Sequence, residues 1–243
     1  MNIDGISCYC ATYGRPKFIL ENSIQCFLNQ DWPGQKELVI LNDCKYQTFI
    51  FDHPQVKILN IEDRIPILGK KFNETIKLCK YNFLAAWEDD DTFLSHRLSY
   101  STSNLYKNLI FHTYDGFVER QPKKLIRKSS YFHSTHILDK NLFEDIGMYD
   151  EVDVRSVDVK FMLKIKKKLG AYSHKTSYDN LFYIYSWLSN SYHASSENFV
   201  NKSISKTVEK QTIRKIDNGE IESGKIKLVP KLRYNFENFL PKA

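Results

Sequence analysis

Four consecutive acidic residues, in the stretch AAWEDDDTF (85–93), directly follow an apolar run. Carboxylates this close together repel one another, so such a cluster persists only when it is exposed to water, neutralised by cations or shared around a metal ion. Within it, Asp89 and Asp91 form an Asp-x-Asp pair. Mg²⁺ and Mn²⁺ prefer one or two carboxylates together with water and phosphate oxygens. The pair is therefore a candidate site for a metal ion that holds a diphosphate, with Glu88 and Asp90 tuning the local field.

The segments before the acids predict a buried parallel sheet. GISCYCATYG (5–14) carries β-favouring residues on both faces, and KELVILND (36–43) is a second short apolar strand. The segment between them, KFILENSIQCFLNQ (17–30), roughly follows helical spacing and is bounded by turn signals. Strand, helix and strand in about 40 residues indicate a right-handed βαβ unit.

The same pattern continues towards the acids. Strands are predicted at 56–61 and 82–87, with a helix at 73–81 between them. Open α/β sheets bind ligands at the carboxyl ends of their strands. The first strand is followed by ATYGR, the second by NDC and the fourth by EDDD. The acids therefore stand where a ligand is expected, at the end of a strand.

The rest of the chain is predicted to complete one domain of the α/β class, with a mostly parallel central sheet flanked by helices. Its strand candidates are 108–120, 129–140 and 180–188, and its helix candidates are 140–151 and 157–170. The sequence has no internal repeat and no low-complexity segment. We expect a catalytic-sized domain over residues 1–200 and a basic C-terminal extension, partly helical, over 201–243.

Cysteine usage and hydropathy indicate a protein that is kept inside the cell. The five cysteines, Cys8, Cys10, Cys26, Cys44 and Cys79, are odd in number and form no CxxC pair. We expect reduced, packed thiols rather than disulfides or a zinc site. No stretch approaches the roughly 18 apolar residues that span a bilayer, and the N-terminus lacks the basic region of a signal peptide. The predicted location is cytoplasmic.

The formal net charge of +6 is concentrated at the end of the chain. Residues 201–243 carry ten Lys or Arg and five Asp or Glu, so the remainder is nearly neutral. A core that binds nucleic acid would carry its basic residues on the folded body, so we expect no nucleic-acid partner. The tail is predicted to be a solvated extension. The alternative is a basic patch that meets anionic lipid, which would make the protein peripheral at a membrane, or an acidic partner.

Four ordered blocks resemble the family 2 glycosyltransferases, which are inverting nucleotide-sugar enzymes with the glycosyltransferase-A fold. Residues 6–43 resemble the family's opening strand, helix and strand, and LGKKFNETIKLCKYNFLAAWEDDD (68–91) resembles the block that carries Asp-x-Asp. THILDKNLFEDIGMYDE (135–151) and SVDVKFMLKI (156–165) resemble the later Gly-x-Phe-Asp-Glu block and the helix that bears the catalytic acid. The resemblance covers roughly residues 4–195.

The resemblance implies transfer of one sugar, in a hexosyltransferase-like reaction with inversion, from a nucleoside diphosphate sugar to a hydroxyl of a glycan or glycoconjugate. A UDP-sugar is the implied donor, and Mn²⁺ or Mg²⁺ the implied cofactor. The implied nucleotide-binding residues are Thr12, Tyr13, Arg15, Asp43, Lys71, Asn73, Asp89 and Asp90, with Tyr13 stacking on the base and Lys70 nearby. The implied metal ligands are Asp91, Asp89 and His193, and the implied general base is Asp158.

Departures from the family pattern leave alternatives open. Val157 and Lys160 replace acids that flank Asp158 in the family, so the nearby acids Asp150, Glu151 and Asp153 could serve as the base instead. The same departures leave open a non-catalytic protein that binds a nucleotide sugar. A sugar nucleotidyltransferase is disfavoured, because ATYGRP has one Gly where such an enzyme has a Gly-rich loop.

Two further expectations concern residues outside the acid cluster. Trp87 is predicted to be a core residue rather than a platform for a sugar. His133, His136 and His174 have no spacing that indicates a role.

Overall fold

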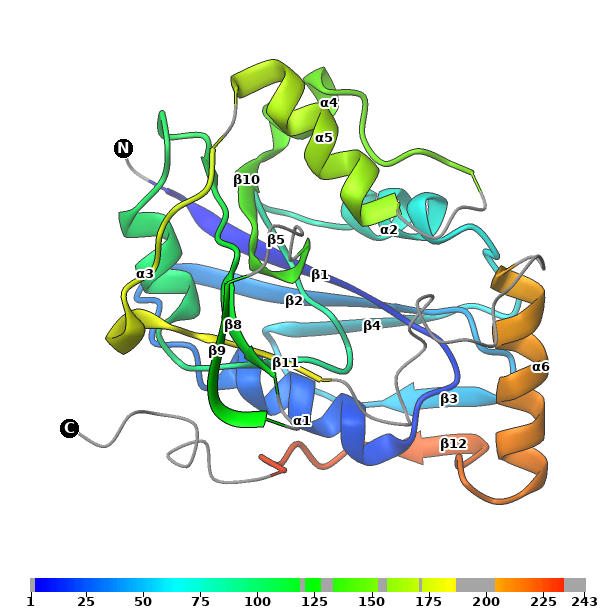
Figure 1. Ribbon diagram of the computed structural model, residues 1–243. Helices are drawn as coiled ribbons and strands as arrows, with labels where there is room; N and C mark the ends of the chain where they lie inside the picture. The colour runs from blue at the N-terminus through cyan, green and yellow to red at the C-terminus, as the bar shows by residue number, and fades with distance from the viewer. Residues whose placement is uncertain are drawn as a thin grey trace.

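The computed structural model describes residues 3–118, 121–127, 133–152, 157–170, 172–186 and 204–233. A six-stranded sheet in the order β4-β2-β1-β5-β10-β7 forms its centre (Figure 1). The strands are β1 (Gly5–Thr12), β2 (Gln35–Asn42), β4 (Val56–Asn60), β5 (Phe83–Ala86), β7 (Ile110–Phe111) and β10 (Ile137–Asp139). In this sheet β10 runs against its neighbours, and the other strands share one direction. The predicted α/β class with a mostly parallel central sheet is confirmed.

Helices cover both faces of this sheet (Figure 1). One face packs on α1 (Lys17–Leu28), where Cys8 and Cys10 of β1 join the apolar side of the helix in one cluster. The opposite face, with Tyr9 of β1, packs on three helices: α2 (Leu68–Lys77), α4 (Lys140–Asp145) and α5 (Val157–Leu169). Because side chains alternate along a strand, one buried strand serves both layers. All five cysteines are free and buried, as predicted.

The start of the chain forms the predicted parallel βαβ unit. β1 and β2 pair in register from Gly5 opposite Gln35 to Thr12 opposite Asn42. β5 lies on the other side of β1 and ends with Ala86 opposite Tyr9. Parallel strands end at one edge of a sheet, so the polar residues that follow β1, β2 and β5 meet at that edge.

Smaller sheets complete the domain. A four-stranded sheet runs in the order β6-β11-β8-β9. Its strands are β6 (Thr92–Phe93), β11 (Tyr183–Tyr185), β8 (Asp115–Val118) and β9 (Gln121–Arg127). The remaining short helices are α3 (Arg97–Ser103), η1 (His133–Thr135) and η2 (Tyr178–Asn180).

Several elements differ from the sequence-based predictions. The strand predicted at 108–120 is divided into β7 and β8, and the one predicted at 129–140 contains η1 before β10. α2 begins at Leu68, five residues before the predicted start, with Gly69 in its first turn. Gly is a poor helix former, so the pattern hides this turn. An added Cβ at Gly69 would come within 2.1 Å of the Asp150 carbonyl oxygen, which shows how closely α2 packs there.

The C-terminal part of the chain packs against the body of the protein. α6 (Ile204–Asp217) is followed by β12 (Gly224–Lys227), which pairs in parallel with β3 (Gln47–Ile50), and all three lie at one side of the central sheet (Figure 1). β3 was not predicted, because its partner is about 175 residues away in the sequence. The domain boundary at residue 200 stays a prediction. In the described part of the chain, no helix is long and apolar enough to cross a membrane.

Candidate active site

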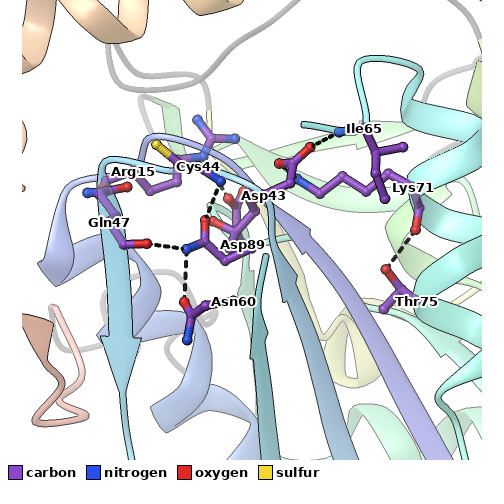
Figure 2. Close-up of polar contacts among 11 residues, drawn as sticks. Arg15, Asp43, Cys44, Gln47, Asn60, Ile65, Lys71, Thr75 and Asp89 are labelled. Atoms are coloured by element: carbon purple, nitrogen blue, oxygen red, sulfur yellow. Dashed lines mark hydrogen bonds and ion pairs between the residues drawn. The ribbon is translucent and has the colours of Figure 1, made fainter. Parts of the chain in front are cut away.

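Two of the four acids share one arginine, which comes from the turn after β1. Arg15 donates from Nε to Asp89 Oδ2 at 2.8 Å and from Nη2 to Asp90 Oδ2 at 3.0 Å. Arg15 is 8% exposed, and the turn that carries it contains Gly14 with a φ of +57°. A left-handed backbone of this kind suits glycine. Arg15, Asp89 and Asp90, three of the residues that the resemblance implies for nucleotide binding, therefore lie together; Figure 2 labels Arg15 and Asp89.

Asp91 is held inside the protein. Its carboxylate accepts hydrogen bonds from Ser134 Oγ at 3.0 Å, Tyr183 OH at 2.7 Å and the Ser186 backbone N–H at 2.9 Å. These donors occupy three of the roughly four lone-pair sites of a carboxylate. The residue is 2% exposed, and burial raises the pKa of Asp91. This arrangement joins the acid cluster to β11 and η1, and it leaves Asp91 little capacity for a metal.

Glu88 lies at a more open position. Its side chain is 26% exposed, and Oε1 is 2.8 Å from His133 Nδ1. Burial, together with the charges of Asp90 and Asp89, raises the pKa of Glu88 to about 8. Burial also lowers the pKa of His133 to about 4. His133 was given no role on the basis of sequence, because its partner becomes its neighbour only in the fold.

Asp158, the predicted base, lies in the first turn of α5 and faces the same region. Burial raises the pKa of both Glu88 and Tyr185, and the charge of Asp158 adds to each shift. Two of the alternative acids have other partners: Asp150 pairs with Lys164 at 2.6 Å, and Glu151 accepts from Asn73 at 3.1 Å. Asp153 and the predicted metal ligand His193 lie outside the described residues.

The polar end of β2 forms a closed ion pair (Figure 2). Lys71 of α2 donates to Asp43 Oδ1 and to the Thr12 carbonyl oxygen, and the second Asp43 oxygen accepts from the Ile65 backbone N–H at 2.8 Å. Burial lowers the pKa of Lys71. The predicted nucleotide-binding residues Thr12, Asp43 and Lys71 are thus together, but Asp43 and Lys71 satisfy one another.

Tyr13 and Asn73 differ in what they present to the site. Tyr13 is about half buried, with the Arg64 guanidinium 3.4 Å from its ring centroid. Asn73 is 2% exposed and exchanges hydrogen bonds with the Tyr149 backbone, from Nδ2 to the carbonyl and from the N–H to Oδ1, each at 3.1 Å. Asn73 therefore ties α2 to residue 149, and its amide is already satisfied. Lys70 is exposed.

Arg97 is another buried cation close to the acids, and the sequence did not single it out. It is fully buried, with its guanidinium carbon 4.6 Å from the ring centroid of Trp87 and 4.0 Å from that of Phe93, and it donates to the carbonyls of Ala86 and Ser134. Burial lowers the pKa of Arg97 to about 10. Trp87 is 1% exposed, which confirms the prediction of a core residue.

The described residues contain no group of three or more His, Cys, Asp or Glu side chains that could hold a metal by themselves. A site that shares a cation with a diphosphate needs fewer, since one or two carboxylates plus phosphate oxygens and water suffice for Mg²⁺. Glu88 and Asp90 fit that pattern because their side chains are 26% and 12% exposed. The donor set is therefore compatible with a metal bound together with a substrate.

No protein-family model and no curated protein sequence matches the chain. Among solved structures, S. aureus TarS 1-349 superposes with a TM-score of 0.53 at 17% identity, over 74% of this chain and 60% of that one. The complex of TarS 1-349 with UDP-GlcNAc superposes with a TM-score of 0.55 at 18% identity, over 89% of this chain and 68% of that one. The complex of TarS 1-349 with UDP superposes with a TM-score of 0.53 at 18% identity, over 75% of this chain and 60% of that one.

The likeness to TarS concerns the fold. The chain spans about 60% of the length of the first of these structures. Both have an α/β fold with a mixed, mostly parallel central sheet flanked by helices, of the glycosyltransferase-A type. The fold predicted from the sequence is thereby confirmed.

Proposed function

We propose that the chain is a metal-dependent inverting glycosyltransferase that moves a sugar from a nucleoside diphosphate sugar to a hydroxyl of a glycan or glycoconjugate. The observation that carries this proposal is the acid cluster after β5, which lies beside the Arg15 turn and within the electrostatic reach of Asp158. The fold neighbours include complexes with UDP and UDP-GlcNAc, which supports a UDP-sugar as the donor.

The donor nucleotide would lie along the carboxyl edge of β1. Tyr13 offers an aromatic ring there, and Arg64 and Lys71 place cationic groups 3.4 Å and 5.9 Å from the ring centroid. Arg15 reduces the repulsion that the acids would exert on a diphosphate, because it pairs with two of them. Binding and orientation of the two substrates would supply much of the rate enhancement.

We assign the metal-facing role to Glu88 and Asp90 rather than to Asp91. Asp91 already accepts three hydrogen bonds and is buried, whereas Glu88 and Asp90 are partly exposed. When bound, Mn²⁺ or Mg²⁺ would act as a Lewis acid that neutralises charge on the leaving nucleoside diphosphate. Asp89 would remain the partner of Arg15 and hold the turn after β1 against the acid cluster.

Asp158 is the proposed general base. Inversion at an anomeric carbon requires a group that removes the proton of the acceptor hydroxyl on the side opposite the leaving group. Asp158 is partly exposed at the start of α5, near Glu88 and Tyr185. Asp150 and Glu151 are weaker candidates, because each is engaged by another side chain.

A ligand screen followed by a transfer assay tests the proposal. We expect a UDP-sugar with Mn²⁺ to raise the melting temperature and to be turned over with a glycan acceptor. Asp158→Asn should keep this stabilisation and lose about 10²- to 10⁴-fold in transfer rate. Asp145→Asn is the matched control, since Asp145 is an exposed acid paired with Lys168.

Three results would count against the proposal. Stabilisation by no nucleoside diphosphate sugar would exclude the donor class. Binding of a donor and Mn²⁺ without turnover on any acceptor would favour a non-catalytic binding protein. Unchanged transfer by Asp158→Asn would remove Asp158 as the base while leaving the donor assignment intact.

A further inference from the structure

A chain of hydrogen bonds runs from Glu88 into the core of the protein. His133 Nδ1 lies 2.8 Å from Glu88 Oε1, and His133 Nε2 is hydrogen-bonded to the Tyr149 hydroxyl. The Tyr149 hydroxyl is 2.6 Å from the Tyr9 hydroxyl, which is 2.7 Å from His136 Nε2. Four side chains from β1, η1 and the segments after η1 and α4 thus connect one acid of the site to the centre of the sheet.

This chain is rigidly packed. Tyr9 and His136 are fully buried, and Tyr149 and His133 are 2% and 5% exposed. The Tyr149 ring lies 4.1 Å from Phe161 of α5 and 5.0 Å from Phe72 of α2, measured between centroids. Phe72 also lies 5.1 Å from His133. The aromatic rings therefore restrict the rotation of the groups that make the hydrogen bonds.

The hydroxyls impose one direction on all four bonds. Each tyrosine hydroxyl has a single hydrogen and two partners in this chain, so it donates to one and accepts from the other. An ionised Glu88, the form that a metal requires, can only accept. His133 must then donate from Nδ1 and accept from Tyr149 at Nε2. If Glu88 carries a proton and donates it to His133 Nδ1, every bond reverses and His133 is held in the other tautomer.

We propose that His133, supported by Tyr149 and Tyr9, is a positioning residue that fixes the orientation of the partly exposed Glu88 carboxyl group. This proposal rests on the proposed function, in which Glu88 faces the metal. One Glu88 oxygen is held by His133, and the other is thereby oriented for a cation. Partners of this kind, one bond away from a ligand, typically affect metal affinity or activity by about 10- to 100-fold.

The first test examines the ring of His133 directly and needs no substrate. In the wild-type protein we expect the imidazole ¹⁵N resonances of His133 to show one protonated and one unprotonated nitrogen. Tyr149→Phe removes the hydroxyl bonded to His133 Nε2 and keeps the ring that packs on Phe161. The Nε2 resonance should therefore shift, whereas the Nδ1 resonance, whose nitrogen stays bonded to Glu88, should change less. Averaged resonances already in the wild type would overturn the proposal.

The second test measures catalysis. Tyr149→Phe should lower kcat by about tenfold and leave KM for the donor within about twofold, because it disturbs orientation rather than donor contacts. Tyr9→Phe, one bond further from Glu88, should have a smaller effect on kcat and provides a second variant if Tyr149→Phe does not fold. Tyr100→Phe is the matched control, since it removes another tyrosine–histidine bond, 2.9 Å from Tyr100 OH to His174 Nε2.

The outcomes distinguish a failure of this proposal from a failure of the proposed function. A fixed His133 tautomer in a protein that turns over no donor would preserve the hydrogen-bonded chain and reject the glycosyltransferase assignment. Turnover by the wild type with an unchanged kcat in Tyr149→Phe would reject the positioning role alone. An equal loss of kcat in Tyr100→Phe would show that the effect is general destabilisation, and it would also reject the positioning role.

Discussion

The ends of β2 and β5 carry similar sequence signals but are built differently. After β2, Asp43 is enclosed: both of its oxygens have donors, from Lys71 and from the Ile65 backbone, and it is 1% exposed. After β5, the acids outnumber their cations. Arg15 serves Asp89 and Asp90, while Glu88 has a neutral histidine as its partner.

The difference shows that an acid after a buried strand is not sufficient evidence of a ligand site. At the end of β2 the charge is balanced within the protein, so the pair serves to join α2 to the sheet. At the end of β5 a net negative charge remains next to partly exposed carboxylates, which an external cation could neutralise. Charge balance and exposure separate the two ends, and neither can be read from the four acids alone.

The largest effect is expected from opening the closed pair. Lys71→Met leaves the buried Asp43 carboxylate without its cation and should cost about 3–5 kcal/mol of unfolding free energy. Urea unfolding measures the loss. Lys71→Met combined with Asp43→Asn should recover much of it, because the uncompensated charge is gone. A double variant no more stable than the single one would contradict the view that this pair is balanced internally.

Asp91→Asn tests the acid of the cluster that accepts three hydrogen bonds inside the protein. The new amide places a donor among Ser134 Oγ and Tyr183 OH, which both donate to Asp91 in the structure. We expect a loss of about 1–3 kcal/mol in urea unfolding, from mismatched buried hydrogen bonds. Wild-type stability in this variant would mean that Asp91 is less constrained than its hydrogen bonds indicate.

Asp90→Asn should give the opposite pattern to Asp91→Asn. Asp90 is partly exposed and shares Arg15 with Asp89, which keeps its own bond to Arg15, so we expect a loss of stability of about 1 kcal/mol or less. The affinity for Mn²⁺ with a UDP-sugar should fall by about tenfold or more, because one charged oxygen ligand is lost. Isothermal titration calorimetry measures this affinity. If Asp91→Asn weakened Mn²⁺ binding and Asp90→Asn did not, the metal-facing roles would have to be exchanged.

A further expected effect is on the dependence of stability on pH. Burial raises the pKa of Glu88 from 4.5 to about 8, so the folded protein binds the extra proton and this stabilisation is lost as pH rises to about 8. Burial lowers the pKa of His133 from 6.5 to about 4. Between pH 4 and 6.5 the unfolded chain therefore binds more protons at this residue, and stability rises with pH. The net fall should therefore appear between pH 6.5 and 8.

Thermal unfolding across that pH range measures this fall. We expect a decrease of roughly 1–2 kcal/mol, or a few degrees in melting temperature, without metal. Glu88→Gln should reduce the slope of the profile, since the amide does not titrate, while the raised pKa of the buried Asp91 still contributes. A profile of the same slope in Glu88→Gln would assign the pH dependence to other groups.

The parts of the fold that follow from local patterns were predicted from the sequence. β1, α1 and β2 carry apolar residues at strand and helix spacing, and their positions agree with prediction. β3 and β12 are four-residue strands whose alternating or exposed patterns are weak, and they form because each supplies the other's hydrogen bonds. Short strands that depend on a distant partner have no signal of their own.

The sequence alone determined the α/β class, the reduced cysteines and the edge of the sheet where the acids lie. It did so because hydrophobic periodicity and strand ends are local properties. Only the tertiary structure decided which acid has which partner. The Glu88–His133, Arg15–Asp89 and Asp43–Lys71 pairs join residues 28–74 positions apart. Such pairing sets exposure, charge balance and pKa, and therefore separates a structural carboxylate from one that could meet a metal.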